Sequence, residues 1–307
     1  MALRLGTLFR YQEIIMSNSS NTPKIYDRPV AVAGATGKQG GAVAARLLAR
    51  GHRVLALTRS PDKPAATALA DAGAELVQAD LEDRHSLDDA LAGAAAVFSV
   101  QDFLEAGVEA EVRQGLNLTA AAAAAAVDHI VYSGASTMDR HTGVPHLDSK
   151  WRIEQELRSL DVPWTVFRPA AFMENWAWQR QTILDDGLMP LPGRPDMTYR
   201  QVSVRDIAAM AVLAFEQPAT WAGQIVSLAG DALTPIQIAE TFSRVLGRPI
   251  RHQQVDWDTC RAKQGEELTA MYRYFDEFGM DGDPGMLRHW HPDALSFEAF
   301  LRLEGWD

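Results

Sequence analysis

The sequence predicts an α/β fold with a doubly wound parallel sheet and a smaller C-terminal α+β lobe. Three observations lead to this prediction. Short apolar segments alternate with helical patterns over the first half of the chain, a glycine-spaced turn joins the first apolar segment to an alanine-rich helix, and the later part of the chain becomes irregular and aromatic. Alternating strands and helices imply a parallel sheet, because right-handed crossovers place helices on both of its faces.

The strands expected in the first part are short, apolar and bounded by turn residues. They cover residues 29–33, 53–58, 75–79, 95–100, 129–133 and 162–169. The expected helices cover residues 40–50, 62–72, 84–92, 106–127 and 148–160. A sheet of this kind binds its ligands outside the carboxyl ends of its strands.

The pattern changes after the sixth strand. Residues 188–195 are expected to be a loop, because their prolines cannot sustain a helix or a central strand. Strands at 201–204, 224–228 and 250–255 and helices at 206–216 and 234–246 follow, and the remainder is expected to be helical. We expect one domain at residues 26–168 and a substrate or partner lobe at 169–307, with a segment of about 201–228 returning to the first domain.

Composition restricts the classes of function. The formal net charge of −11 over 307 residues disfavours direct binding of nucleic acid, because an acidic surface repels phosphates. Cys260 is the only cysteine, so an intramolecular disulfide is excluded and a reducing, cytoplasmic location fits best. We expect no membrane association, since no apolar run reaches spanning length.

Residues 1–25 are expected to form a disordered N-terminal extension. This segment is mildly apolar but lacks a continuous hydrophobic stretch followed by a small-residue cleavage site. Met16 precedes a polar run and resembles a natural start, so the sequence leaves open whether the chain begins at Met1 or Met16.

The glycine-spaced turn is the most informative motif. Gly34, Gly37 and Gly40 stand three residues apart, after one strand and before one helix. Residues without Cβ let backbone N–H groups approach a pyrophosphate at the helix N-terminus, which favours nucleotide binding over a purely structural turn. The predicted cofactor contacts of this turn are Gly34, Thr36, Gly37, Lys38, Gln39 and Gly40.

The end of the second strand indicates which nucleotide binds. NAD-preferring sites usually carry an acidic residue there, whereas this chain has Arg59 and reaches its first carboxylate only at Asp62. A guanidinium suits a 2′-phosphate, and Lys38 and Lys63 add further cations, so we expect NADPH or NADP. The alternative is that Arg59 and Lys38 are solvated surface charges.

Sheet topology places further residues around the cofactor. Asp80 and Leu81, at the end of the third strand, are expected to meet the adenine ring. Ser99, Val100 and Gln101, at the end of the fourth strand, are expected beside the central phosphates and the nicotinamide ribose. No metal ligand set is expected.

Several motifs together resemble the NmrA-like family of atypical short-chain dehydrogenase/reductases. They are the turn at 34–40, Arg59, Val131-Tyr132-Ser133-Gly134, Val162-Pro163-Trp164, Arg168-Pro169 and Phe172-Met173-Glu174-Asn175. The resemblance covers residues of about 26–305 and implies a Rossmann-type NAD(P)-binding domain. The family contains quinone and triphenylmethane reductases, and also redox sensors and a transcriptional co-regulator that bind dinucleotide without evident turnover.

Short-chain dehydrogenases carry a Tyr-x-x-x-Lys motif, and the matching residues here are His146 and Lys150. The resemblance implies that Lys150 binds the nicotinamide ribose and supplies positive charge, and both residues are our catalytic candidates. The alternatives are a surface Lys150 paired with Glu154 and a solvated loop His146. Loss of the tyrosine argues against ordinary carbonyl–alcohol chemistry.

Residues past the fifth and sixth strands are expected to face nicotinamide or substrate. Ser133 is assigned to the cofactor, and Ser136, Phe172 and Asn175 to a substrate pocket. The favoured function is hydride transfer from NADPH to a small planar acceptor such as a quinone. The alternative is a non-catalytic redox sensor with a regulatory protein partner. The alanine-rich stretch 120–126 offers a face for a homodimer.

Overall fold

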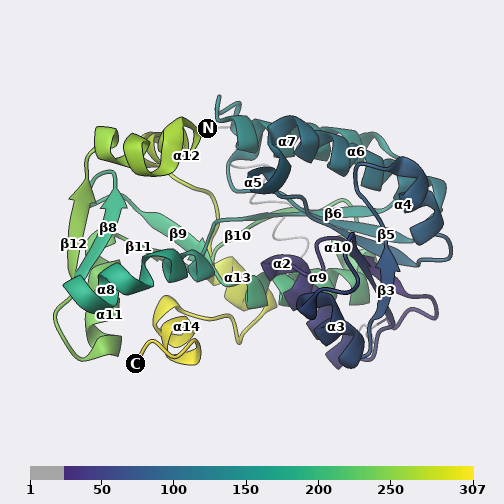
Figure 1. Cartoon of the computed structure of the whole chain (residues 1–307), viewed down its shortest axis with the longest axis horizontal. Helices are drawn as coiled ribbons and strands as arrows, with labels where there is room; N and C mark the ends of the chain where they lie inside the picture. The colour runs from purple at the N-terminus through teal and green to yellow at the C-terminus, as the bar shows by residue number, and fades with distance from the viewer. Residues whose placement is uncertain (1–23) are drawn as a thin grey trace.

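The computed structural model describes residues 24–307, so the extension predicted at 1–25 lies outside the described residues except for its last two (Figure 1). Its centre is a seven-stranded parallel sheet in the order β10-β6-β5-β4-β1-β2-β3. The strands are β1 Val30–Val32, β2 Val54–Thr58, β3 Glu75–Gln78, β4 Ala96–Ser99, β5 His129–Ser133, β6 Trp164–Pro169 and β10 Ile225–Leu228. The predicted doubly wound α/β fold is therefore confirmed.

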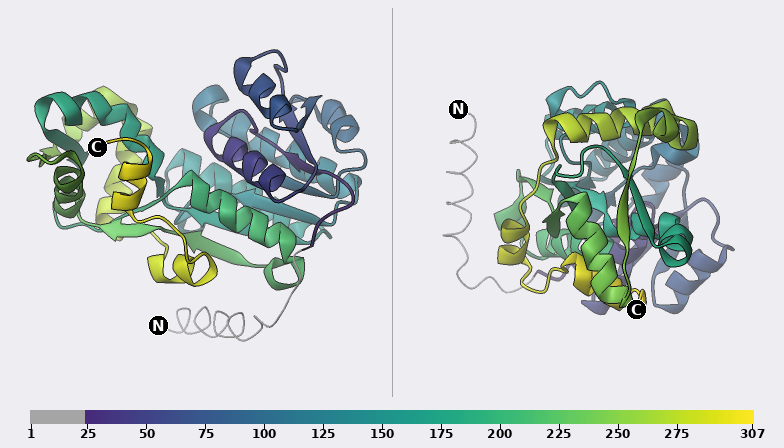
Figure 2. Two further views of the ribbon diagram at one scale, coloured as in Figure 1. Left: turned by 90° about the horizontal axis from the view of Figure 1, so that it is seen from below. Right: turned by 90° about the vertical axis from the view of Figure 1, so that its left-hand side faces the viewer.

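Helices cover both faces of this sheet, and alternate strand residues face different layers. Val30 and Val32 point to one face, which is covered by α2 Lys38–Ala49, α3 Pro64–Asp71, α9 Val204–Glu216 and α10 Pro218–Trp221. Ala31 and Ala33 point to the other face, which is covered by α4 Arg84–Ala90, α6 Val108–Ala124 and α7 Pro145–Ser159. Figure 2 shows α2 and α9 side by side.

The predicted helix 106–127 is wrong in its first turn. The chain instead forms a short helix α5 at Phe103–Ala106 and then α6, with Gly107 between them at φ +87°. That backbone conformation strongly favours glycine and interrupts the helix. Within the alanine-rich stretch of α6, Ala121 and Ala122 are fully buried in the core. These two residues therefore face the interior of this chain.

The smaller C-terminal lobe carries two further sheets. One has the order β11-β9-β7, from Ala171–Phe172 (β7), Tyr199–Val202 (β9) and Asp231–Leu233 (β11). The other pairs β8 Leu188–Pro192 with β12 Arg251–Val255. The helices here are α8 Arg180–Asp186, α11 Pro235–Leu246, α12 Trp257–Phe278, α13 Pro284–Trp290 and α14 Phe297–Leu303. The lobe also contains the 3₁₀ segment η2 Met173–Gln179, whereas the 3₁₀ segment η1 Met138–Arg140 lies between β5 and α7.

The loop predicted at 188–195 is wrong, because most of it is strand β8. The Gly187 carbonyl accepts a hydrogen bond from the Arg251 N–H at 2.9 Å. In a parallel ladder the bonds then continue from residues 189 and 191, so Pro190 and Pro192 direct their missing N–H positions away from β12. An edge strand tolerates proline on that side.

Part of the later chain returns to the main sheet. β10 pairs in parallel with β6, and α9 packs against α2. β9, which precedes α9 in the sequence, belongs instead to the three-stranded sheet. The interior of the lobe is aromatic: Trp176 packs against Tyr199, Phe242 and Phe297.

Candidate functional site

The glycine turn lies between β1 and α2, where the order of the strands reverses. Gly34 has φ +61°, and the Gly37 N–H donates to the Gly34 carbonyl at 2.8 Å. A Cβ on Gly40 would lie 2.2 Å from that carbonyl oxygen, so only glycine lets the helix approach the strand this closely. Gly34 and Gly37 are exposed, so the turn is open on its outer side.

The N-terminus of α2 has no capping side chain among the described residues. Within residues 24–307 no side chain caps the helix at Gly37, and the first turn contains no acidic residue. The first N–H groups of a helix carry partial positive charge and need acceptors. The turn and the helix N-terminus can therefore hold an anion such as a phosphate.

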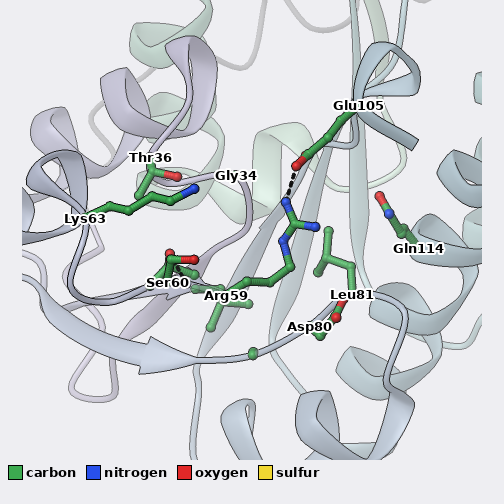
Figure 3. A pocket seen from close by; sticks show the side chains of 12 residues that line it. Gly34, Thr36, Arg59, Ser60, Lys63, Asp80, Leu81, Glu105 and Gln114 are labelled. Atoms are coloured by element: carbon green, nitrogen blue, oxygen red, sulfur yellow. Dashed lines mark hydrogen bonds and ion pairs between the residues drawn. The ribbon is translucent and has the colours of Figure 1, made fainter. Parts of the chain in front are cut away.

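A pocket adjoins this turn at the carboxyl ends of β1, β2 and β3 (Figure 3). The predicted cofactor residues that line it are Gly34, Thr36, Arg59, Asp80 and Leu81. Lys63 also lines it, as expected for a further cation. Thr58, Ser60, Glu105 and Gln114 complete the polar lining and were not predicted. Residues from five separate segments, namely the glycine turn, the ends of β2 and β3, α5 and α6, thus meet around one cavity.

Arg59 occupies the centre of this pocket. Its guanidinium donates to the carboxylate of Glu105, and this interaction raises the pKa of Arg59 (Figure 3). Both side chains are more than half exposed, so the pair is accessible to a ligand. Lys38 lies elsewhere, with its ammonium group 4.9 Å from the ring centroid of Trp178, which is itself 69% exposed.

Asp80 and Leu81 form the wall at the end of β3. A carboxylate oxygen of Asp80 accepts from the Glu82 N–H at 2.9 Å, and the Leu81 carbonyl accepts from the side chain of Asn117 at 3.0 Å. These bonds fix the turn after β3 and leave the side chain of Leu81 half-buried in the pocket wall.

Ser99, Gln101 and Ser133 lie at the ends of β4 and β5. The buried Ser99 accepts from Gln101 Nε2 at 3.0 Å, and Ser133 donates to Gln39 Oε1 at 2.7 Å. Gln101 Oε1 is buried and has no hydrogen-bond partner among the described residues. Val100 packs against Gly34, whose Cβ position would lie 3.0 Å from it. The end of β5 is thereby joined to α2, and the end of β4 packs against the glycine turn.

Lys150 lies on α7 near this edge of the sheet. Its ammonium group pairs with the fully buried carboxylate of Glu111, and it lies 3.5 Å from the Gln101 carbonyl. The alternative pairing with Glu154 is wrong, because Glu154 binds the guanidinium of Arg168 at 2.7 and 2.9 Å. Lys150 thus points inward, toward the end of β4.

His146 is not in a solvated loop, so that alternative is also wrong. α7 begins at Pro145, earlier than predicted, since proline suits the first position of a helix. The buried imidazole stacks on Phe103 at 4.4 Å between centroids, and its Nδ1 lies 2.9 Å from Glu267 Oε1. Burial lowers the pKa of His146, and the hydrogen bond with Glu267 opposes this shift.

The residues predicted for the substrate pocket lie between the main sheet and the lobe. Ser136 is buried and exchanges two hydrogen bonds with the backbone of Asp281, at 2.7 and 3.1 Å. Phe172 on β7 and Asn175 on η2 are half-buried. Ser136 therefore holds a segment of the C-terminal lobe against the main sheet.

The partners of the site residues escaped sequence reasoning. Glu111 falls inside the helix predicted at 106–127, Glu105 just before it, and Glu267 inside a segment expected only to be helical. Each binds a residue at least 39 positions away, at Arg59, Lys150 and His146 respectively. The negative charge of these three glutamates was the one signal in the sequence, and a charge does not specify which residue it pairs with. No group of three metal-ligating side chains occurs in residues 24–307. No helix in this described part of the chain could cross a membrane.

The doubly wound sheet and the glycine turn at its switch point define a Rossmann-type α/β protein. The chain belongs to the NmrA-like family, whose model matches residues 27–301. A (4-alkanoyl-5-oxo-2,5-dihydrofuran-3-yl)methyl phosphate reductase of Streptomyces griseus is 35% identical over 236 residues, which cover 76% of this chain and 79% of that protein.

Two solved structures share the fold. The NADPH-dependent quinone oxidoreductase QOR2 of Escherichia coli, complexed with NADPH, has a TM-score of 0.78 at 23% identity. The match covers 90% of this chain and 99% of that one. NmrA, a negative transcriptional regulator in complex with NADP, has a TM-score of 0.77 at 22% identity, over 90% and 95% of the two chains.

Proposed function

We propose that this protein binds NADPH at the carboxyl edge of its main sheet and transfers hydride to a small planar acceptor such as a quinone. One observation carries the proposal. The uncapped N-terminus of α2 adjoins a pocket that also contains Arg59 and Lys63. Backbone N–H groups and two cations are the groups that a phosphorylated dinucleotide requires.

The adenosine end of the cofactor fits the pocket. Arg59 and Lys63 would bind the 2′-phosphate, and Asp80 and Leu81 would border the adenine ring. The pyrophosphate would accept hydrogen bonds from the first turn of α2, where Gly37 leaves room for it. This orientation directs the nicotinamide toward the ends of β4 and β5, where Gln101, Ser133 and Lys150 lie.

Bound NADPH supplies a hydride, which carries two electrons to the acceptor, and a proton completes reduction of a quinone to a hydroquinone. The protein has to align donor and acceptor and exclude competing reactions. Lys150 would orient the nicotinamide ribose, with its charge compensated by Glu111. His146 is engaged by Glu267 and Phe103, so we assign the proton to solvent.

The relatives support a reductase. The Streptomyces protein is named a reductase, and QOR2 is named an NADPH-dependent quinone oxidoreductase. The alternative is a redox sensor, in which cofactor binding alters a surface for a regulatory protein. His146 favours this alternative, because it replaces the usual tyrosine and is buried against the C-terminal lobe. The fold of a transcriptional regulator is equally similar.

Two measurements separate these functions. Calorimetry with NADPH tests cofactor binding, and oxidation of NADPH with a panel of quinones tests turnover. Binding together with acceptor-dependent oxidation supports the reductase. Binding without oxidation of NADPH by any quinone supports the sensor. If NADPH does not bind, both proposals are wrong.

A further inference from the structure

We propose that Glu105 is a specificity-determining residue that favours a free ribose 2′-hydroxyl and opposes a 2′-phosphate. The proposal rests on the proposed function, because it concerns the adenosine end of the same site. The pocket therefore contains two opposed determinants: Arg59, which attracts a phosphate, and Glu105, which competes with it.

The geometry of the pocket gives the first argument. Arg59 extends from the end of β2 and turns its guanidinium to the carboxylate of Glu105 on α5 (Figure 3). Both residues line the cavity, while Lys63 extends into it from the side of Thr36. Of the residues around Arg59 in this cavity, Glu105 is the one bonded to its guanidinium.

Charge gives the second argument. A 2′-phosphate that approaches Arg59 must displace Glu105 or lie beside its carboxylate, and both cost free energy. A carboxylate favours a 2′-hydroxyl instead, because the hydroxyl can donate a hydrogen bond to it. NAD-binding sites of this fold usually take that carboxylate from the end of the second strand. Here Glu105 delivers the same group to the same place from α5.

The flexibility expected of α5 determines how strongly Glu105 opposes the binding of a 2′-phosphate. This helix has four residues and ends at Gly107, and Leu104, Glu105 and Ala106 are exposed. Its inward contacts are the stacking of Phe103 on His146 and its packing against α6. Few contacts therefore oppose a shift of Glu105, so a 2′-phosphate can bind at a modest cost. We expect Glu105 to tune cofactor preference rather than to exclude NADPH.

The test compares binding of NADP⁺ and NAD⁺, which differ only by the 2′-phosphate, to the full chain by calorimetry at one ionic strength. Glu105→Gln should increase the ratio of the NADP⁺ to the NAD⁺ association constant about fivefold, since an exposed ion pair contributes up to ~1 kcal/mol. Glu109→Gln is the matched control: Glu109 is exposed, pairs with Arg152, and its substitution removes the same charge four residues away. That variant should leave the ratio unchanged.

The outcomes are distinguishable. If Glu105→Gln leaves the ratio unchanged or lowers it, the proposal is wrong. An equal rise in the Glu109→Gln variant would also overturn it, because a general charge effect would then explain the change. If the unaltered protein binds neither dinucleotide, the proposed function itself fails. Circular dichroism of both variants establishes that the fold is retained.

Discussion

Glu111 on α6 is fully buried and holds the ammonium group of Lys150 on α7. Ser149 donates to the other oxygen of the same carboxylate. Since α6 and α7 pack side by side, this ion pair joins two helices beneath the edge where the cofactor is proposed to bind. Lys150 is thus fixed in position by a residue that sequence comparison with the Tyr-x-x-x-Lys motif would not suggest.

Replacement of Glu111 by glutamine should therefore destabilise the protein. The ammonium group of Lys150 would keep its charge in a largely buried position and lose its carboxylate, which costs about 3 kcal/mol for a buried pair. Urea denaturation would measure the loss. Glu109→Gln, which breaks the exposed pair with Arg152, should cost less than about 1 kcal/mol. Equal effects of the two variants would contradict the structural role assigned to Glu111.

Arg59→Asp should remove the preference for NADPH over NADH. The substitution deletes the guanidinium that would bind the 2′-phosphate and adds a second carboxylate beside Glu105. A charge-assisted hydrogen bond contributes about 1.5–3 kcal/mol, so the dissociation constant for NADPH should rise at least tenfold. The dissociation constant for NADH should change little. Fluorescence titration with each cofactor is the measurement, and equal constants in the unaltered protein would refute the assignment.

Two glycines of the turn should respond differently to alanine. Gly40→Ala should destabilise the fold by about 3 kcal/mol, because its Cβ would meet backbone atoms of Gly34 at 2.2 Å. Gly37→Ala should keep the fold, since its φ of −96° suits alanine and its nearest contact is 3.3 Å away. It should nevertheless weaken NADPH binding, because the methyl group would occupy space near the helix N-terminus. Thermal denaturation and cofactor titration would separate the two effects, and a stable Gly40→Ala variant would contradict this account.

Sequence reasoning predicted what local patterns determine. The residues that determine the first strand, the glycine turn and the following helix lie within 25 consecutive positions. The positions of Gly34 and Gly40 in the turn could therefore be predicted from the sequence. The ends of neighbouring parallel strands meet at one edge, and topology therefore brought Arg59 and Asp80 to the same pocket.

The partners of these residues could not be predicted, because they depend on distant packing. Glu105 reaches Arg59 only because Gly107 separates α5 from α6, and a continuous helical pattern gave no sign of that break. The strand β8 was missed for a different reason. Its prolines argue against a central strand, and only pairing with β12 reveals that they lie on an outer edge.

His129 should make the stability of the fold depend on pH. Burial lowers its pKa from 6.5 to about 4, and Lys24 contributes to this shift. Thr165 donates its hydroxyl proton to the Trp221 carbonyl, so His129 Nε2 must donate to Thr165, at 2.9 Å. Nδ1 is buried without a partner among the described residues. Protonation would place an N–H there with nothing to accept it.

The sign of the effect follows from this depressed pKa. The unfolded chain binds a proton near pH 6.5 and the folded chain only near pH 4, so stability is full above pH 6.5 and falls as the pH decreases toward 4. At pH 5 the loss from His129 should be about 2 kcal/mol. In His129→Gln, whose side-chain amide can still donate to Thr165, this part of the loss should vanish. Urea denaturation of both proteins at pH 7 and pH 5 gives the comparison, and identical losses in the two proteins would show that His129 does not titrate as its surroundings require.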